Sequence, residues 1–301
     1  MRPRHPIHPL LFLLPTVLTL GVFFVAPLGI AIKNSLYSWD MLTPPRWVGA
    51  GNYVGLVRTG ELAGILGRTA AYSAIVVTLS LALGLALAVA LDRAGTIYAI
   101  VRGAVFSAYV VSWVAVALLW TWLLDADAGV VGAVVRAFGG RPTSWLADPD
   151  RALVAVALVS VWKLTGYSMV IFLAGLQDVP RSVLEAAALD GAGPARRFWE
   201  VTWPLLRPSA AFVATTALLA SFQAFDVVRV MTQGGPVKAT TLFVYAIYEH
   251  VFVNLRVGRA SALTVVFFVV LLAVTALQLW AWRAASGAGA RRGEAAKEAA
   301  S

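Results

Sequence analysis

Six long apolar runs, separated by shorter polar segments, constrain the fold of this 301-residue chain more than any other feature. A helix needs about 20 mostly apolar residues to cross a bilayer. Runs of that length lie at about residues 9–32, 69–91, 103–124, 152–176, 209–231 and 260–282. Because they leave little of the chain for a domain outside the membrane, we expect one all-α domain over residues 1–301. The sequence thus predicts a polytopic membrane protein with six transmembrane helices.

Composition excludes a soluble globular domain, because 60% of the residues are hydrophobic and only 13% are charged. The net charge of +9 is spread over segments that flank apolar runs, which favours contact with anionic lipid headgroups over nucleic acid. The chain has no cysteine, and its histidines lie in a tail or a loop, at His5, His8 and His250. This distribution disfavours a buried zinc site and an intramembrane hydrolase. We therefore expect no enzymatic activity, no cofactor and no metal site.

The first apolar run has two interpretations, a retained transmembrane helix or a cleaved signal peptide. The apolar region of a signal peptide is about 7 to 15 residues long, and this run is longer. It also contains Pro15 and Pro27. We therefore expect a retained first helix.

The longest polar interruption between two apolar runs is the segment 177–208. Pro180 suits a first helical turn, Ser182 and Glu185 have the spacing of a capping box, and Gly191 can end a short helix in the left-handed conformation. A second helix is expected to begin at Gly193–Pro194 and to be kinked or closed by Pro204. The sequence predicts two short helices around a glycine bend at the membrane surface.

This segment resembles the EAA signature of the permease subunits of binding-protein-dependent ABC importers. The matching residues are Glu185, Ala186, Ala187, Asp190, Gly191 and Ala192, followed by Val201, Trp203 and Pro204. The family usually has Ile and Leu where this chain has Val201 and Trp203. In that family the loop is the coupling helix, which lies in a groove of the cytoplasmic ATPase. The resemblance implies ATPase coupling through Glu185, Ala186, Ala187, Asp190, Gly191 and Pro204, whereas spacing alone also fits an ordinary amphipathic hairpin.

Other stretches resemble the carbohydrate-uptake branch of the same family, and above all its sn-glycerol-3-phosphate permeases. They read WVGAGNYVGL, SVWKLTGYSMVIF and GGPVKATT. The resemblance implies uptake of sn-glycerol-3-phosphate or a glycerophosphodiester, with a neutral sugar such as trehalose or a maltose-type oligosaccharide as the alternative. It also implies a second homologous permease, an ATPase dimer and an extracytoplasmic solute-binding protein as partners. No phosphate-binding Walker motif is present, so a separate subunit must hydrolyse ATP. A secondary transporter with its own ion coupling is the other class of transporter considered. It is disfavoured because such proteins need no EAA loop.

The orientation follows from charge and from this loop. With both termini inside, 12 Lys and Arg fall in the inside segments and 10 in the longer outside segments, which favours this arrangement modestly. A segment that docks on an ATPase must also be cytoplasmic. We therefore expect a multi-pass protein of the bacterial cytoplasmic (inner) membrane with both termini in the cytoplasm.

Three ionisable residues fall inside the predicted spans, where each costs at least about 2.5 to 3.5 kcal/mol unless it faces protein or water. They are Lys163, Asp226 and Arg229. Phe222, Asp226 and Arg229 lie at i, i+4 and i+7, so we expect them to share one face of the fifth helix. We expect a substrate path formed by Lys163, Phe222, Gln223, Asp226 and Arg229. Two alternatives remain open, an ion pair between Lys163 and Asp226 and an Arg229 side chain that extends to the interface.

Overall fold

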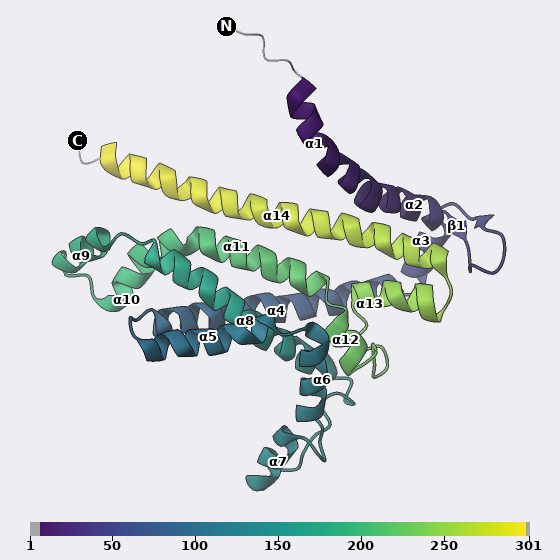
Figure 1. Cartoon of the computed structure of the whole chain (residues 1–301), viewed down its shortest axis with the longest axis horizontal. Helices are drawn as coiled ribbons and strands as arrows, with labels where there is room; N and C mark the ends of the chain where they lie inside the picture. The colour runs from purple at the N-terminus through teal and green to yellow at the C-terminus, as the bar shows by residue number, and fades with distance from the viewer. Residues whose placement is uncertain (1–6, 299–301) are drawn as a thin grey trace. The chain divides into compact units, whose positions relative to one another are not determined.

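The computed structural model describes the backbone of residues 7–298 and the side chains of residues 12–282. Within this range the chain is helical except for one two-stranded hairpin and the connecting loops (Figure 1). It forms two compact units. Unit 1 contains the described residues up to Gly64 together with Ala246–Val270, and unit 2 contains Ile65–Tyr245 together with the described residues from Leu271.

Among the residues that the structure describes, five helical segments are long and apolar enough to cross a membrane, and a sharply bent pair of helices makes a sixth if it counts as one span. The five are Phe12–Ser35, Glu61–Leu91, Ala152–Gln177, Pro194–Phe222 and Val257–Trp282. The first contains α1 (Ile7–Leu20) from Phe12 on, the π-helix η1 (Gly21–Val25) and α2 (Ala26–Ser35). The second and third are α4 (Glu61–Leu91) and α8 (Ala152–Gln177), and the last lies in α14 (Val257–Glu298). The predicted all-α fold is confirmed.

The apolar run predicted as a helix over residues 103–124 differs from the expectation. Its helix begins earlier, as α5 (Thr96–Val110), and a second helix, α6 (Trp113–Leu123), follows at an angle of 101°. Val111 and Ser112 between them have extended backbone, with ψ of 143° and 140°. No proline or glycine marks this break, so nothing in the local sequence predicts it. In Figure 1, α6 turns away from α5 toward α7 (Val130–Ala137).

The run predicted as a helix over residues 209–231 also breaks. The helix α11 (Trp203–Phe222) ends at Phe222, and a separate short helix, α12 (Asp226–Met231), begins four residues later. The expectation that Phe222, Asp226 and Arg229 share one face of one helix is therefore wrong. The sequence between the two helices contains no glycine or proline, but α12 packs against α6, a tertiary contact that the local pattern does not reveal.

Helix α8 forms the centre of unit 2, with α5 and α11 packed along it. Glycines allow the closest approaches. A Cβ atom on Gly84 of α4 would lie 2.5 Å from Ser168 Cβ of α8, and one on Gly175 would lie 2.4 Å from Ser209 Oγ of α11. The small-residue face of α4 is buried, with Ser80 and Ala88 both fully inaccessible. Small faces of this kind let helices pack closely in lipid.

Unit 1 is organised around Asn52 of helix α3 (Gly51–Arg58). Its amide donates hydrogen bonds to the carbonyls of Ser35 at 2.8 Å and Tyr37 at 2.9 Å, and so joins α2 to strand β1 (Tyr37–Ser38). Strand β1 pairs antiparallel with β2 (Arg46–Trp47). Between them, hydrogen bonds from the backbone N–H and hydroxyl of Thr43 to Asp40 lower the pKa of that carboxyl group.

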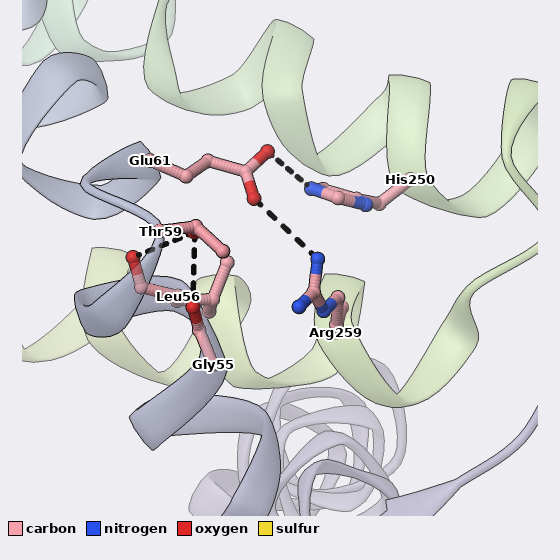
Figure 2. A network of polar contacts seen from close by, with 6 residues as sticks. All are labelled: Gly55, Leu56, Thr59, Glu61, His250 and Arg259. Carbon is pink, nitrogen blue, oxygen red and sulfur yellow. Dashed lines mark hydrogen bonds and ion pairs between the residues drawn. The ribbon is translucent and has the colours of Figure 1, made fainter.

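A partly buried polar cluster lies where α4 begins (Figure 2). The carboxylate of Glu61 is 2.9 Å from Nε2 of His250, which belongs to the π-helix η3 (Glu249–Val253) after α13 (Phe243–Tyr248). Its other oxygen lies 3.7 Å from Arg259 Nη1 at the start of α14. The His250 side chain is 4% exposed, and its Nδ1 has no hydrogen-bond partner. Glu61 therefore supplies the one side-chain partner that this imidazole has among residues 12–282.

We expect Glu61→Ala to destabilise the protein by about 1 to 3 kcal/mol, because it leaves the buried His250 ring with no hydrogen bond. The matched control is Arg196→Ala, which removes an ion pair with Glu200 whose side chains are 66% and 59% exposed. This control should change stability by no more than about 0.5 kcal/mol. Thermal unfolding of the purified protein measures both, and equal shifts for the two variants would contradict the assignment.

Candidate functional site

The segment 177–208 folds into a short helix, a glycine bend and a second helix that continues into α11, as part of a segment long enough to span a membrane. The first helix, α9, spans Arg181–Leu189, and Pro180 is its N-cap residue with ψ of 126°. Pro180 therefore lies just before the first turn of α9 and not within it, which differs from the prediction. Because the helix begins at Arg181, Ser182 lies inside it and cannot act as an N-cap. The cap has no side-chain hydrogen bond, so the predicted capping box of Ser182 and Glu185 is wrong.

The bend at Gly191 is confirmed. Its φ is +78°, and no atom would lie within 4 Å of an added Cβ, so the backbone angle is the reason for glycine here. The N–H of Gly191 donates to Ala188 O at 3.1 Å, and that of Ala192 donates to Ala187 O at 3.0 Å. These bonds satisfy carbonyls at the end of α9, as a left-handed residue after a helix commonly does.

The second helix, α10 (Pro194–Arg197), begins at Pro194 with Gly193 as N-cap, as predicted. Pro204 does not close it. The chain passes through the π-helix η2 (Phe198–Thr202) into α11, and the Trp203 N–H donates to Phe198 O five residues back. Pro204 has no N–H to offer the carbonyl four residues before it. The π-helical turn absorbs this defect, so the helix remains continuous from Pro194 to Phe222.

The predicted coupling residues lie mostly on the surface. Glu185, Ala186, Asp190 and Gly191 are exposed, while Ala187 and Pro204 are half-buried. Large apolar side chains are exposed beside them, with Leu189 at 90% and Trp199 at 62%. The segment also faces its own unit, because Leu184 and Phe198 line a cavity of about 330 Å³ together with Val89 of α4 and Leu176 of α8. Because this exposed segment is continuous in sequence with α8 and α11, a displacement of it can be transmitted to those two long helices.

Two of the predicted substrate-path residues line one cavity of about 290 Å³. They are Gln223 and Asp226, at the break between α11 and α12. The other lining residues are Trp113, Ala220, Ala224, Phe225 and Val227. Phe222 is buried and Arg229 is half-buried, and neither lines this cavity. Sequence reasoning missed Trp113, because its position depends on the unpredicted break between α5 and α6.

Lys163 is separate from that cavity and makes different contacts from those expected. It is 2% exposed, and its ammonium donates hydrogen bonds to the carbonyls of Ala108 at 3.2 Å, Tyr109 at 2.9 Å and Val111. It also lies 5.0 Å from the ring centroid of Trp113. Among the ion pairs of residues 12–282 there is none between Lys163 and Asp226. The Lys163 ammonium therefore donates to backbone carbonyls, and not to the carboxylate of Asp226 as the ion-pair interpretation required.

The long apolar helices define the class as a multi-pass membrane protein. The sequence profile of the family described as "Binding-protein-dependent transport system inner membrane component" matches residues 80–284. The chain belongs to this family, as its resemblance to the EAA permeases predicted. It is therefore a permease subunit of a binding-protein-dependent ABC importer, located in the inner membrane.

Several curated relatives are named "sn-glycerol-3-phosphate transport system permease protein UgpA". The protein from Agrobacterium fabrum (strain C58 / ATCC 33970) is 32% identical over 276 residues, covering 90% of this chain and 93% of the relative. The one from Yersinia enterocolitica is 33% identical over 280 residues, covering 90% and 92%. Members of the family are non-catalytic membrane subunits, which confirms that the chain is not an enzyme.

Solved structures share the fold. A chain from the crystal structure of a bacterial ABC transporter involved in the import of the acidic polysaccharide alginate superposes with a TM-score of 0.78 at 20% identity, over 90% of this chain and 93% of that one. A chain from the alginate transporter in complex with a periplasmic protein bound to an alginate pentasaccharide gives a TM-score of 0.79 at 20% identity, over 91% and 93%. At this identity the likeness establishes the ABC importer permease fold.

Proposed function

We propose that the chain forms the transmembrane path of an ATP-driven importer for sn-glycerol-3-phosphate or a glycerophosphodiester. The observation that carries this proposal is the set of relatives at 32% to 33% identity that are named for sn-glycerol-3-phosphate transport and match over nine-tenths of the chain. The complete importer would contain a second homologous permease, an ATPase dimer and an extracytoplasmic solute-binding protein. The alginate transporter, which was crystallised with its periplasmic protein, supports this composition.

The coupling role belongs to the segment 177–208 in this proposal. Its exposed helix α9 would dock on the ATPase, with Glu185 and Asp190 at the protein surface and the bend at Gly191 setting the angle between α9 and α10. The support is geometric, since the segment is exposed, lines a cavity together with residues of α4 and α8, and is continuous in sequence with α8 and α11. Docking on the ATPase would place this segment and both termini in the cytoplasm.

The cavity at the break between α11 and α12 would form part of the solute path. The carboxylate of Asp226 and the amide of Gln223 offer hydrogen bonds suited to hydroxyl groups, and the Trp113 ring offers an apolar wall. A carboxylate repels a phosphate, so Asp226 would contact the glycerol hydroxyls. A carboxylate beside an indole also suits a neutral sugar, and this observation supports the second candidate, a permease for trehalose or a maltose-type oligosaccharide.

Uptake in whole cells tests the proposed solute. The chain and its three kinds of partner would be expressed in a bacterial strain that lacks other sn-glycerol-3-phosphate uptake systems. We expect uptake of labelled sn-glycerol-3-phosphate that an unlabelled glycerophosphodiester inhibits and that trehalose and maltose leave unchanged. Labelled trehalose or maltose uptake without sn-glycerol-3-phosphate uptake would overturn the proposal in favour of the neutral sugar.

The cavity is tested in the same cells with Asp226→Asn, which keeps the side-chain shape and removes the charge. We expect uptake to fall about tenfold, because the hydrogen bonds of a solute hydroxyl to a charged group are stronger than those to a neutral amide. Asp150→Asn is the control, since Asp150 is exposed and lies outside this cavity. Equal uptake in the two variants, at equal amounts of assembled importer, would remove Asp226 from the path.

A further inference from the structure

Lys163 is a buried cation in the middle of α8 whose hydrogen-bond partners are all backbone carbonyls. A charged side chain inside the membrane is costly and is usually paired with another group or faces water. Here the ammonium donates to the carbonyls of Ala108, Tyr109 and Val111, at the end of α5. An ammonium has three N–H bonds to donate. These contacts use all three, so no donor remains for a carboxylate or a solute phosphate.

The geometry of α8 brings these carbonyls within reach. Gly166 lies one helical turn after Lys163, and a Cβ atom there would be 2.4 Å from Val105 O and 3.0 Å from Phe106 Cα. The backbone of α5 therefore rests directly on α8. The stacked rings of Tyr109 and Tyr167, with centroids 4.8 Å apart, continue the same contact. The last carbonyls of α5 consequently lie within hydrogen-bond distance of Lys163 Nζ.

The carbonyls that end a helix have no partner inside that helix and carry partial negative charge. Water is scarce within a membrane, so another group must satisfy them. At the break after α5 the Lys163 ammonium does so through charge-assisted hydrogen bonds, while the ring faces of Trp113 and Tyr109 lie 5.0 and 5.8 Å away. The buried ammonium thus gains hydrogen-bond acceptors, and the carbonyls at the end of α5 gain hydrogen-bond donors.

We propose that Lys163 is a positioning residue: it caps the C-terminal end of α5, holds the chain in its 101° turn into α6, and thereby sets Trp113 as a wall of the cavity that contains Gln223 and Asp226. Trp113 is the first residue of α6 and lines that cavity, and α6 packs against α12, which contributes Asp226. The role of the cavity in transport rests on the proposed function, whereas the role of Lys163 at the break does not.

The test compares two neutral variants of similar length. Lys163→Met removes every donor, and Lys163→Gln keeps an amide with two N–H bonds. The control is Ser160→Ala, which removes the 2.6 Å hydrogen bond between Ser160 and Tyr72 elsewhere on α8 and so creates a buried defect away from the break. The chain has no cysteine, so in an importer whose other subunits are made cysteine-free, Leu158→Cys and Trp122→Cys place spin labels on α8 and on the end of α6 without competing sites. Both positions are exposed, at 45% and 52%.

The distance distribution between the labels, measured in the purified importer without solute, reports the orientation of α6. We expect one narrow distribution with Lys163 and with Ser160→Ala, a broad one with Lys163→Met, and an intermediate one with Lys163→Gln. Solute uptake should fall roughly tenfold or more for Lys163→Met and less for Lys163→Gln. If Lys163→Met prevents assembly, Lys163→Gln still tests whether the number of N–H donors at position 163 decides the orientation of α6.

Each other outcome overturns the proposal. Narrow distributions in both neutral variants with equal losses of uptake would mean that Lys163 acts through its charge, for instance on a solute anion. A distribution in Ser160→Ala as broad as in Lys163→Met would mean that any defect in α8 releases α6. Because the distance is measured without solute, a wrong solute would leave it unchanged, so failure of the proposed function and failure of this inference are distinguishable.

Discussion

Replacing Gly191 with valine is expected to abolish transport and solute-stimulated ATP hydrolysis while the importer still assembles. Gly191 holds a φ of +78° at the bend between α9 and α10, a conformation that costs a β-branched residue roughly 1 to 3 kcal/mol. An added side chain meets nothing within 4 Å, so the expected cause is the altered backbone and not a clash. The bend would relax toward another conformation, and α9 would no longer present its surface at the angle required for docking.

The neighbouring glycine provides a matched control. Gly193 is equally open, with nothing within 4 Å of an added Cβ, but its φ is −66°. Gly193→Ala should therefore retain transport. Both variants are compared by uptake and by ATP hydrolysis at equal amounts of assembled importer. Full coupling in Gly191→Val, or an equal loss in Gly193→Ala, would show that the glycine bend does not carry the coupling.

Replacing Gly166 with alanine is expected to displace α5 from α8. The new Cβ would lie 2.4 Å from the carbonyl oxygen of Val105, a backbone atom that cannot turn away as a side chain does. Overpacking of this kind typically costs about 1 to 3 kcal/mol, and here α5 must shift as a whole. The shift would also draw the carbonyls at the end of α5 away from Lys163. Yield, thermal stability and uptake should all fall.

The control lies on the partner helix of the same contact. Gly103 of α5 is exposed and has no atom within 4 Å of an added Cβ. Alanine is the better helix former by roughly 0.5 to 1 kcal/mol, so Gly103→Ala should be neutral or stabilising. Thermal unfolding of the two purified variants makes the comparison. A Gly166→Ala protein as stable as Gly103→Ala would contradict the close approach of α5 and α8.

Local signals in the sequence predicted much of this fold. The apolar runs located five membrane-length helices because twenty apolar residues leave few alternatives to a spanning helix. The glycine bend at Gly191 and the helix start at Pro194 also followed from local backbone chemistry. The four-residue spacing of Ser80, Gly84 and Ala88 predicts a small face for close helix packing, and all three residues are buried on α4.

The two helix breaks could not be predicted, because tertiary contacts stabilise them. The break at Val111–Ser112 depends on an ammonium that lies more than fifty residues away in sequence, on α8. The break after Phe222 accompanies the packing of α12 against α6. Both changed the candidate site. They placed Phe222 and Asp226 in different helices and brought Trp113 to the wall of the cavity that Gln223 and Asp226 line.

Cross-linking in native membranes tests most directly the claim that α9 couples this permease to an ATPase. The chain has no cysteine, so a single one can be placed by Ala188→Cys, at an exposed position of α9, or by Val237→Cys, at a position that is 89% exposed in the loop after α12. A maleimide that carries a photoreactive group should join the ATPase subunit to the Ala188→Cys variant and not to the Val237→Cys variant. In intact cells, a membrane-impermeant maleimide should label only the Val237→Cys variant. Labelling of the Ala188→Cys variant from outside, with no product containing the ATPase, would contradict the coupling role and the orientation together.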